Sequence, residues 1–309
     1  NGLVGSEMCI RDRPGSISSG DATLFTGDAP AQDALILPRR PRPRAGAIPS
    51  GTPVPTLTDA APESQPPPLD VSVVIPVCNE EENVLPLARE IHAALEGGFA
   101  FETIFVDDGS TDGTARAVVA ARLQGMPEVR LVRHQVRSGQ SAAVATGVRA
   151  ARARWIATLD GDGQNDPADI PKLLEAARQA DSPGLRLVMG NRTTRRDTWL
   201  RRLSSRVANG VRGGLLKDGT PDTGCGIKVF DRDVFLDMPR FNHMHRFMPA
   251  LFQREGYEVI SVPVNHRERT RGKSKYGLHN RLWVGIVDLF GVMWLIRRAS
   301  PRVPAKEES

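Results

Sequence analysis

The stretch Val71–Val77 (VSVVIPV), followed by Cys78-Asn79-Glu80, decides the fold. It is a short, β-branched apolar run that ends in polar residues, which is typical of a buried strand. Asn79 is expected to cap the helix that follows. Three further apolar runs follow, separated by residues at helical spacing: Phe101–Val106, Val129–Val132 and Trp155–Leu159. This alternation predicts an α/β domain with a mostly parallel sheet and helices on both faces.

Acidic residues follow two of these strands where each one ends, as Asp107-Asp108-Gly109-Ser110 and as Asp160-Gly161-Asp162-Gly163-Gln164. Ligands of parallel sheets bind at the carboxyl ends of the strands. Hard oxygen ligands suit Mg²⁺ or Mn²⁺, which usually also bind substrate phosphates. A calcium-binding EF-hand is excluded, because Asn165 and Pro171 stand where its glycine and glutamate belong. Solvated turns are the alternative, and the placement after buried strands argues against it.

Charge is divided unequally along the chain of 309 residues, whose formal net charge is +5. Residues 70–185 hold 11 Lys and Arg against 17 Asp and Glu, a net charge of −6. Residues 186–309 hold 24 against 12, a net charge of +12. A basic half indicates phosphates, anionic lipid or nucleic acid, with a solvated surface as the alternative. We expect no nucleic-acid partner, because interleaved aromatics and a recognised motif are both missing.

Composition also divides the chain into segments. Residues 1–69 hold 12 of the 24 prolines and are expected to be a disordered, proline-rich segment. Within it, residues 1–13 resemble translated sequencing-adapter read-through and are set aside. Residues 70–278 are expected to form the catalytic domain, and residues 279–309 a terminal helix and tail. The 3 cysteines are scattered, which excludes a disulfide framework.

The ordered combination of Val74–Glu80, Val106–Thr114 and Asp160–Gln164 resembles the family 2 glycosyltransferases. The resemblance implies the GT-A fold, a Rossmann-like fold of nucleotide-diphospho-sugar transferases. It is strongest to the polyprenyl-phosphate branch, typified by dolichol-phosphate mannosyltransferase. This implies a hexosyltransferase that moves a sugar, with inversion, from a nucleotide-sugar donor to a polyprenyl (dolichyl or undecaprenyl) phosphate acceptor.

The resemblance also implies roles for individual residues. Those expected to bind Mg²⁺ or Mn²⁺ are Asp160, Asp162 and Gln164. Those expected to hold the nucleotide sugar are Pro76, Glu80, Asp107, Asp160, Gly161 and Asp162. Arg192, at the end of another apolar strand, is expected to bind a phosphate of the same ligand. Those expected to act in catalysis are Asp162 together with Arg269 and Lys275 of a basic loop. In Asp222–Lys228, Lys228 replaces the family's arginine, which keeps the charge but loses the bidentate fork.

The segment Leu282–Ile296 is almost entirely apolar. As a helix it would measure about 22 Å, short of the ~30 Å hydrocarbon core of a bilayer. Trp283 and Trp294 fall on nearly the same face, and arginines flank both ends, which favours an interfacial helix. A helix packed on the catalytic domain is the alternative. We therefore expect a peripheral protein at the cytoplasmic face of the cell membrane.

Two other functions stay open on the sequence. One is a family 2 glycosyltransferase that acts on a glycan or soluble hydroxyl, and the other is an idle nucleotide-sugar binding module. The complete Asp160–Gln164 motif argues against the second. The histidines His243, His245 and His266 are not expected to bind metal, because no carboxylate completes a ligand set at helical spacing.

Overall fold

The computed structural model describes residues 68–179, 182–192, 213–216, 218–268 and 278–299, with side chains left out at 278–284. The chain divides into two units, Asn1–Glu63 and Ser64–Ser309, and every described residue belongs to the second. The expected disordered segment 1–69 lies almost wholly outside the described residues.

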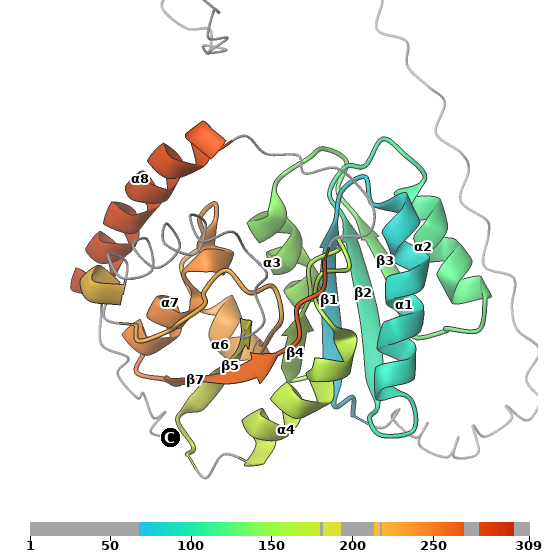
Figure 1. The fold of residues 1–309 in the computed structure, drawn as a ribbon, viewed down its shortest axis with the longest axis horizontal. Coiled ribbons are helices and arrows are strands. Elements are labelled where there is room, and N and C mark those ends of the chain that lie inside the picture. Colours follow the sequence, from blue (N-terminus) through green and yellow to red (C-terminus); the bar gives the residue numbers. More distant parts are fainter. Residues whose placement is uncertain (1–67, 180–181, 193–212, 217, 269–277, 300–309) are drawn as a thin grey trace, which may run out of the picture. The chain divides into compact units, whose positions relative to one another are not determined.

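The described strands form one sheet in the order β3-β2-β1-β4-β6-β5-β7 (Figure 1). Their bounds are β1 Val71–Val77, β2 Phe101–Asp107, β3 Val129–Arg133, β4 Trp155–Thr158, β5 Leu185–Arg192, β6 Lys228–Asp231 and β7 Glu258–Val264. β1 pairs in parallel with β2 and β4, β2 with β3, and β5 with β7. Of the described strands, β6 alone runs antiparallel to its neighbours, β4 and β5. The prediction of a mostly parallel sheet is confirmed.

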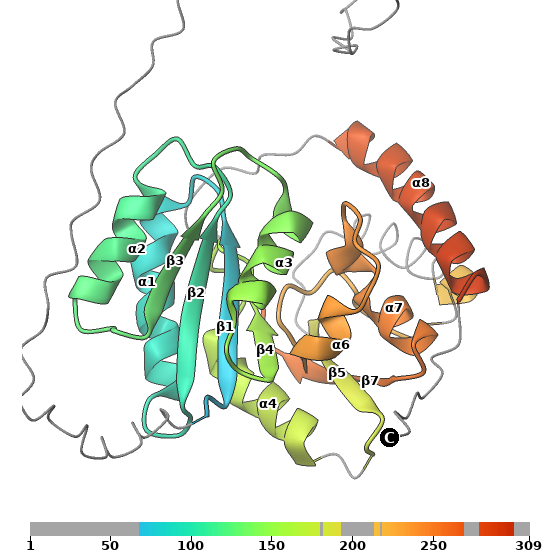
Figure 2. The ribbon, with the colours of Figure 1, turned by 180° about the vertical axis from the view of Figure 1, so that it is seen from behind.

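Helices cover both faces of this sheet, as the views from the front and from behind show (Figures 1 and 2). Their bounds are α1 Glu81–Leu95, α2 Thr114–Leu123, α3 Gln140–Ala150, α4 Ile170–Gln179, α6 Arg232–Leu236, α7 Met248–Arg254 and α8 Leu278–Arg297, with short 3₁₀ turns η1 Pro167–Asp169 and η2 Met244–Arg246. Side chains of β1 alternate between the two faces: Ile75 packs in the core under α1 and α4, and Val74 in the core under α3 and α7. Strand alternation thus builds two cores from one buried sheet.

The turn after β1 differs from the expectation for Asn79. α1 begins at Glu81, and the side chain of its N-cap residue, Glu80, makes no capping hydrogen bond. Asn79 instead takes a left-handed backbone conformation, with φ of 52°. Its side-chain oxygen accepts a hydrogen bond from the backbone N–H of Thr111, at 2.8 Å. The residue therefore ties the loop after β1 to the loop after β2, a long-range contact that local spacing cannot reveal.

α8 packs against the same domain through one side and leaves another side exposed. Val292 is fully buried in the core shared with α7, and the guanidinium of Arg254 donates to the carbonyl of Leu295 at 3.0 Å. Phe290 and Trp294 are 62% and 61% exposed. Among the described residues, no helix has the length and apolar character needed to cross a membrane. One side of α8 therefore packs on the domain, and the contact of its exposed side with a membrane stays a prediction.

Candidate active site

The carboxyl ends of β1 and β2 lie side by side, and backbone hydrogen bonding continues between them past the end of β2. Val77 and Asp107 are register partners, and the N–H of Asp108 donates to the carbonyl of Val77 at 2.8 Å. Asp107 is fully buried. One of its carboxylate oxygens accepts from the N–H of Ser110 at 2.9 Å, and the other forms an ion pair with Arg133 at 3.1 Å. A buried carboxylate held this way is fixed in position for a ligand at the sheet edge.

Glu80 and Pro76 occupy the end of β1. The backbone N–H of Glu80 donates to the hydroxyl of Thr114 at 2.9 Å, and its carboxylate accepts from the amide of Asn83 at 2.7 Å. Pro76 lines a cavity described below. The sequence-predicted nucleotide residues Pro76, Glu80 and Asp107 thus share one edge of the sheet.

Asp160 and Asp162 follow β4 in a tight loop. The N–H of Asp160 donates to the side-chain oxygen of Asn165 at 3.0 Å, and the N–H of Gln164 donates to the carboxylate of Asp162 at 3.1 Å. Burial raises the pKa of Asp160, and the negative charge of Asp162 raises it further. A buried carboxylate beside a second one is a place where added positive charge is stabilised.

Two glycines let the chain pass closely around these carboxylates. A Cβ at Gly226 would lie 2.2 Å from a carboxylate oxygen of Asp160, and one at Gly161 would lie 2.7 Å from Val77 and 3.0 Å from the carbonyl of Pro76. Neither position has room for a side chain. Gly161 was expected at the donor site; the structure shows that a larger residue would not fit there, and its contact with the donor stays a prediction.

Lys228 and Arg192 bring positive charge to the loop of Asp160. Lys228 is buried at the start of β6, and its ammonium donates to the carbonyl of Cys225. Burial lowers the pKa of Lys228, although the charge of Asp160 opposes this. Burial would also lower the pKa of Arg192, but hydrogen bonds to Asp222 raise it. The Nε and Nη2 atoms of Arg192 form a fork with the Asp222 carboxylate, at 2.6 and 2.7 Å.

This fork qualifies the expected role of Arg192 as a phosphate ligand. Its guanidinium is already paired, so its charge near Asp160 is partly offset by Asp222. The pair joins β5 to the turn before β6, because Arg192 is the last residue of β5 and Asp222 precedes β6 in the chain. Arg192 therefore fixes the backbone of Asp222–Lys228 as well as adding charge.

The first turn of α3 is held by Asp108 and in turn holds two site residues. The carboxylate of Asp108 accepts from the backbone N–H groups of Ser138 and Gly139, at 2.7 and 2.8 Å. Immediately after this anchor, the amide of Gln140 donates to Asp160 at 2.9 Å. The hydroxyl of the next residue, Ser141, bonds to the imidazole Nδ1 of His245 at 2.8 Å.

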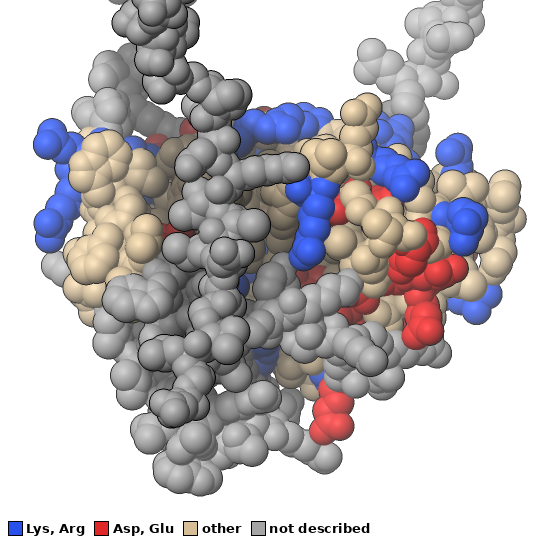
Figure 3. Space-filling model, turned by 90° about the horizontal axis from the view of Figure 1, so that it is seen from above, with Lys and Arg blue, Asp and Glu red and all other residues tan. Residues whose placement is uncertain are grey.

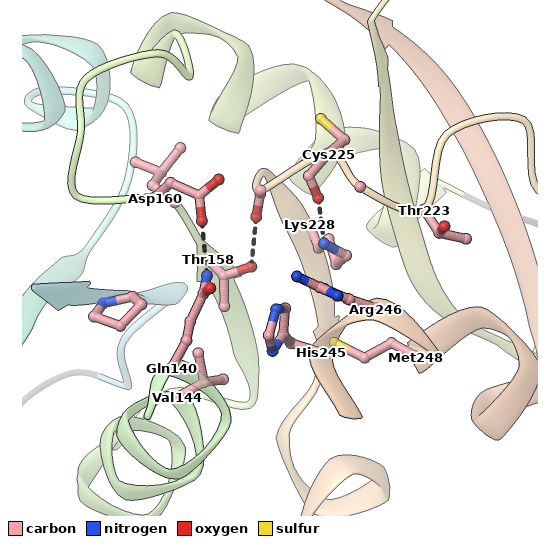
Figure 4. A pocket seen from close by; sticks show the side chains of 14 residues that line it. Gln140, Val144, Thr158, Asp160, Thr223, Cys225, Lys228, His245, Arg246 and Met248 are labelled. Carbon is pink, nitrogen blue, oxygen red and sulfur yellow. Dashed lines mark hydrogen bonds between the residues drawn. The ribbon is translucent and has the colours of Figure 1, made fainter. Parts of the chain in front are cut away.

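A cavity of about 340 Å³ opens between α3, β4, β6 and η2 (Figure 4). It brings together the predicted residues Pro76 and Asp160. Its other lining residues are Gln140, Val144, Thr158, Leu159, Thr223, Gly224, Cys225, Gly226, Lys228, His245, Arg246 and Met248. Sequence reasoning missed Gln140, His245 and Arg246, because only the folded chain brings residues about a hundred positions apart together.

Arg269 and Lys275, which were expected to act in catalysis, lie outside the described residues. The chain just before it is placed: the N–H of Arg267 donates to the carbonyl of Gln164 at 2.9 Å, and His266 forms a strand bridge with Asn165. The described residues that precede Arg269 therefore lie beside the acidic loop, and the roles of Arg269 and Lys275 stay a prediction.

The donor set fits a Mg²⁺ or Mn²⁺ ion that completes its shell from a substrate. No group of three or more His, Cys, Asp or Glu side chains that could hold a metal ion occurs among the described residues. The acidic loop instead offers two carboxylates, Asp160 and Asp162, and the amide of Gln164. Mg²⁺ is usually held by one or two carboxylates together with substrate phosphates. The raised pKa of Asp160 is a further sign that the loop accepts positive charge.

The fold and this acidic edge define a nucleotide-sugar transferase, and the chain belongs to glycosyl transferase family 2, whose family model matches residues 72–238. The predicted family, enzyme class and fold are therefore confirmed. The dodecaprenyl-phosphate galacturonate synthase of Rhizobium johnstonii is 37% identical over 236 residues, which cover 74% of this chain and 68% of that protein. The undecaprenyl-phosphate 4-deoxy-4-formamido-L-arabinose transferase of Edwardsiella ictaluri is 35% identical over 209 residues, covering 67% of this chain and 63% of that protein.

Solved structures agree with the fold. The glucosyl-3-phosphoglycerate synthase of Mycobacterium tuberculosis, with Mn²⁺, UDP-glucose and phosphoglyceric acid, superposes with a TM-score of 0.56 at 18% identity over 73% of this chain and 79% of that one. The same enzyme with Mg²⁺ and UDP gives a TM-score of 0.56 at 19% identity over 75% and 80%. At this identity the likeness concerns the fold alone.

Proposed function

We propose that the protein transfers a sugar from a nucleotide-diphosphate donor to a polyprenyl phosphate, with Mg²⁺ or Mn²⁺ held by Asp160, Asp162 and Gln164. The observation that carries this proposal is the meeting of Asp160 with two cations, Lys228 and Arg246, in one cavity at the carboxyl end of β4. A divalent ion and fixed cations stabilise the charge that develops on a leaving diphosphate. Relatives named for polyprenyl-phosphate acceptors support the choice of acceptor.

The chemistry of the cavity favours an anionic acceptor over a neutral hydroxyl. A hydroxyl acceptor needs a general base within hydrogen-bond reach. Among the described residues that line the cavity, Asp160 is the one carboxylate, and it belongs to the metal-binding set. The pKa of His245 is lowered to about 3, first by burial and then by Lys228, so it is a weak base. A lipid phosphate is already an anion and can react once cations position it.

The surface of α8 supports a peripheral position on the membrane. Val287, Phe290 and Trp294 expose apolar side chains along the helix, and the exposed Arg297 and Arg298 follow them. Figure 3 shows the molecule from above, with α8 on the left as in Figure 1. Side chains that are neither basic nor acidic gather at this left side with Lys and Arg beside them. Most of the visible Asp and Glu side chains lie at the right, on the side of α1 and α2. Apolar burial and headgroup attraction together favour interfacial binding at the cytoplasmic face.

A donor screen tests the proposal. Purified full-length protein is incubated with undecaprenyl phosphate, Mn²⁺ and, in turn, UDP-glucose, UDP-galactose, UDP-galacturonate, UDP-4-deoxy-4-formamido-L-arabinose and GDP-mannose. Mass spectrometry of the lipid extract should show one glycosylated lipid phosphate that depends on Asp162. Donor binding without lipid or soluble product would instead indicate an idle binding module, and product on a soluble hydroxyl acceptor alone would contradict the proposed acceptor.

A further inference from the structure

We propose that His245 recognises the transferred sugar through a hydrogen bond between its imidazole Nε2 and a sugar hydroxyl. The inference rests on the proposed function and adds a specificity-determining residue to it. The carboxylates of the acidic loop are instead proposed to hold the metal ion.

The imidazole of His245 is held in one orientation. Its Nδ1 bonds to the hydroxyl of Ser141 at 2.8 Å, and Ser141 is buried in the first turn of α3. Figure 4 shows the ring between Gln140 and Val144 on one side and Arg246 and Met248 on the other, facing the cavity. Within the described part of the chain, Nε2 makes no hydrogen bond. Because Nδ1 is occupied from behind, Nε2 is the ring atom left to meet a ligand.

The charge state of the ring selects the kind of ligand. The charges of Lys228, Arg246 and His243 add to burial in holding the pKa of His245 at about 3, so the imidazole is neutral at physiological pH. A neutral imidazole presents either a donor or an acceptor at Nε2, according to its tautomer. A sugar hydroxyl both donates and accepts, so it pairs with either tautomer. A phosphate oxygen only accepts and is bound more strongly by a cation.

The cations of the cavity already provide for phosphates. Lys228 lies beside Asp160, and Arg246 is the next residue after His245 along η2. Of the other side chains next to the ring, Val144 and Met248 are apolar, and the amide of Gln140 already donates to Asp160. His245 is therefore a neutral polar group of that wall with a ring nitrogen that makes no hydrogen bond within the described part of the chain, whereas Gln140 and Thr158 already donate to Asp160 and to the carbonyl of Gly226.

Binding measurements with and without the sugar test the assignment. The donor that gives product in the screen and its bare nucleoside diphosphate are titrated calorimetrically, each with Mn²⁺, into wild-type protein and into His245→Phe and His245→Gln. The sugar increment is the dissociation constant of the bare nucleoside diphosphate divided by that of the nucleotide sugar. His245→Phe should reduce it by about tenfold or more, because an unpaired buried hydroxyl is costly, while the bare diphosphate binds as before. His245→Gln, which keeps a donor and an acceptor, should restore part of the increment.

The matched control is His92→Phe, on α1 and away from the cavity, where His92 bonds to Glu128. It should leave both constants unchanged. A sugar increment that stays at the wild-type value in both His245 variants, with normal binding of the diphosphate, overturns the inference and leaves the proposed function intact. If His245→Phe binds neither ligand, His245→Gln decides by the same criterion. A wild-type protein that transfers none of the donors refutes the proposed function, and the inference falls with it.

Discussion

The amide of Gln140 donates a hydrogen bond to the carboxylate of Asp160 at 2.9 Å, which ties the first turn of α3 to the acidic loop after β4. Asp108 anchors that turn from behind, and Ser141 extends the same arrangement to His245. One helix start therefore positions both the carboxylate expected to bind metal and the imidazole of the cavity wall.

Gln140→Leu should weaken metal binding and transfer by roughly 10- to 100-fold, because it removes the amide that orients the Asp160 carboxylate. Activity titrated against Mn²⁺ measures the effect, and excess metal should restore part of it. The matched control is Gln124→Leu, at the exposed residue that follows α2, and it should leave activity unchanged. Equal metal dependence in both variants would show that the Gln140–Asp160 contact has no role in metal binding.

Asp160→Asn should abolish transfer and yet raise the melting temperature near neutral pH by about 2–4 °C. Burial and the charge of Asp162 raise the pKa of Asp160 in the folded state. Folded protein then holds the proton more tightly than unfolded protein, so stability falls as pH rises from the unfolded pKa through the folded one. Thermal melts at pH 4 and pH 7.5 check this: the gain should be present at pH 7.5 and shrink at pH 4. A variant less stable than wild type at pH 7.5 contradicts the assignment.

Asp108→Asn should destabilise the protein by about 1–3 kcal/mol at pH 7, because the carboxylate holds His134 and two backbone N–H groups. Burial alone would raise the pKa of Asp108, but these hydrogen bonds lower it. A lowered folded pKa gives stability that is present above the unfolded pKa and is lost as pH falls through the folded one. Urea unfolding at pH 7 and pH 3 should show the difference from wild type shrinking at pH 3. The exposed Glu175→Gln serves as control.

Arg269→Ala and Lys275→Ala should each lower kcat by about tenfold or more and change the donor KM much less, if their charges act as the leaving diphosphate and acceptor phosphate approach. Steady-state kinetics with the identified donor separates the two parameters. Arg122→Ala, exposed on α2, is the control. A raised donor KM with unchanged kcat would make either residue a simple binding contact.

Replacing Phe290 and Trp294 by Ser should reduce flotation of the protein with anionic vesicles while leaving its melting temperature close to wild type. Both side chains are exposed, so their loss removes apolar membrane contact rather than core packing. Leu123→Ser removes an equally apolar side chain that is 81% exposed on α2, and it should float as wild type does. Deletion of the whole helix is a poorer test, because Val292 is part of the core. Unchanged flotation of the double variant would refute the anchoring role of α8.

Much of the sheet could be predicted from the sequence because its strands are buried apolar runs. β1 to β5 lie where the runs place them, and Asp107 and Asp160 follow strand ends at the expected edge. β6 escaped prediction because it is four residues long and carries Lys228 and Asp231 at its ends. Its antiparallel insertion between β4 and β5 depends on long-range pairing, which periodicity cannot show.

The site divides in the same way. Residues of the acidic loop form a local motif, so their types and spacing predict their chemistry. Gln140 and His245 have no motif: one is the first residue of a helix, and the other belongs to a 3₁₀ turn more than a hundred residues away. Arg192 was expected to be a phosphate ligand because the resembling family has such an arginine at this strand end, and its fork with Asp222 emerges only from the folded chain.

The most direct test of the account compares undecaprenyl phosphate with undecaprenol as acceptors for the same donor, with Mn²⁺ and with EDTA. The two lipids differ only in the phosphate that the cations of the cavity are proposed to position. We expect glycosylated lipid when wild-type protein is given undecaprenyl phosphate and Mn²⁺. We expect none when undecaprenol replaces the phosphate, when EDTA replaces Mn²⁺, or when Asp162→Ala replaces the wild-type protein. Equal transfer to undecaprenol, or full activity in EDTA, would contradict the account.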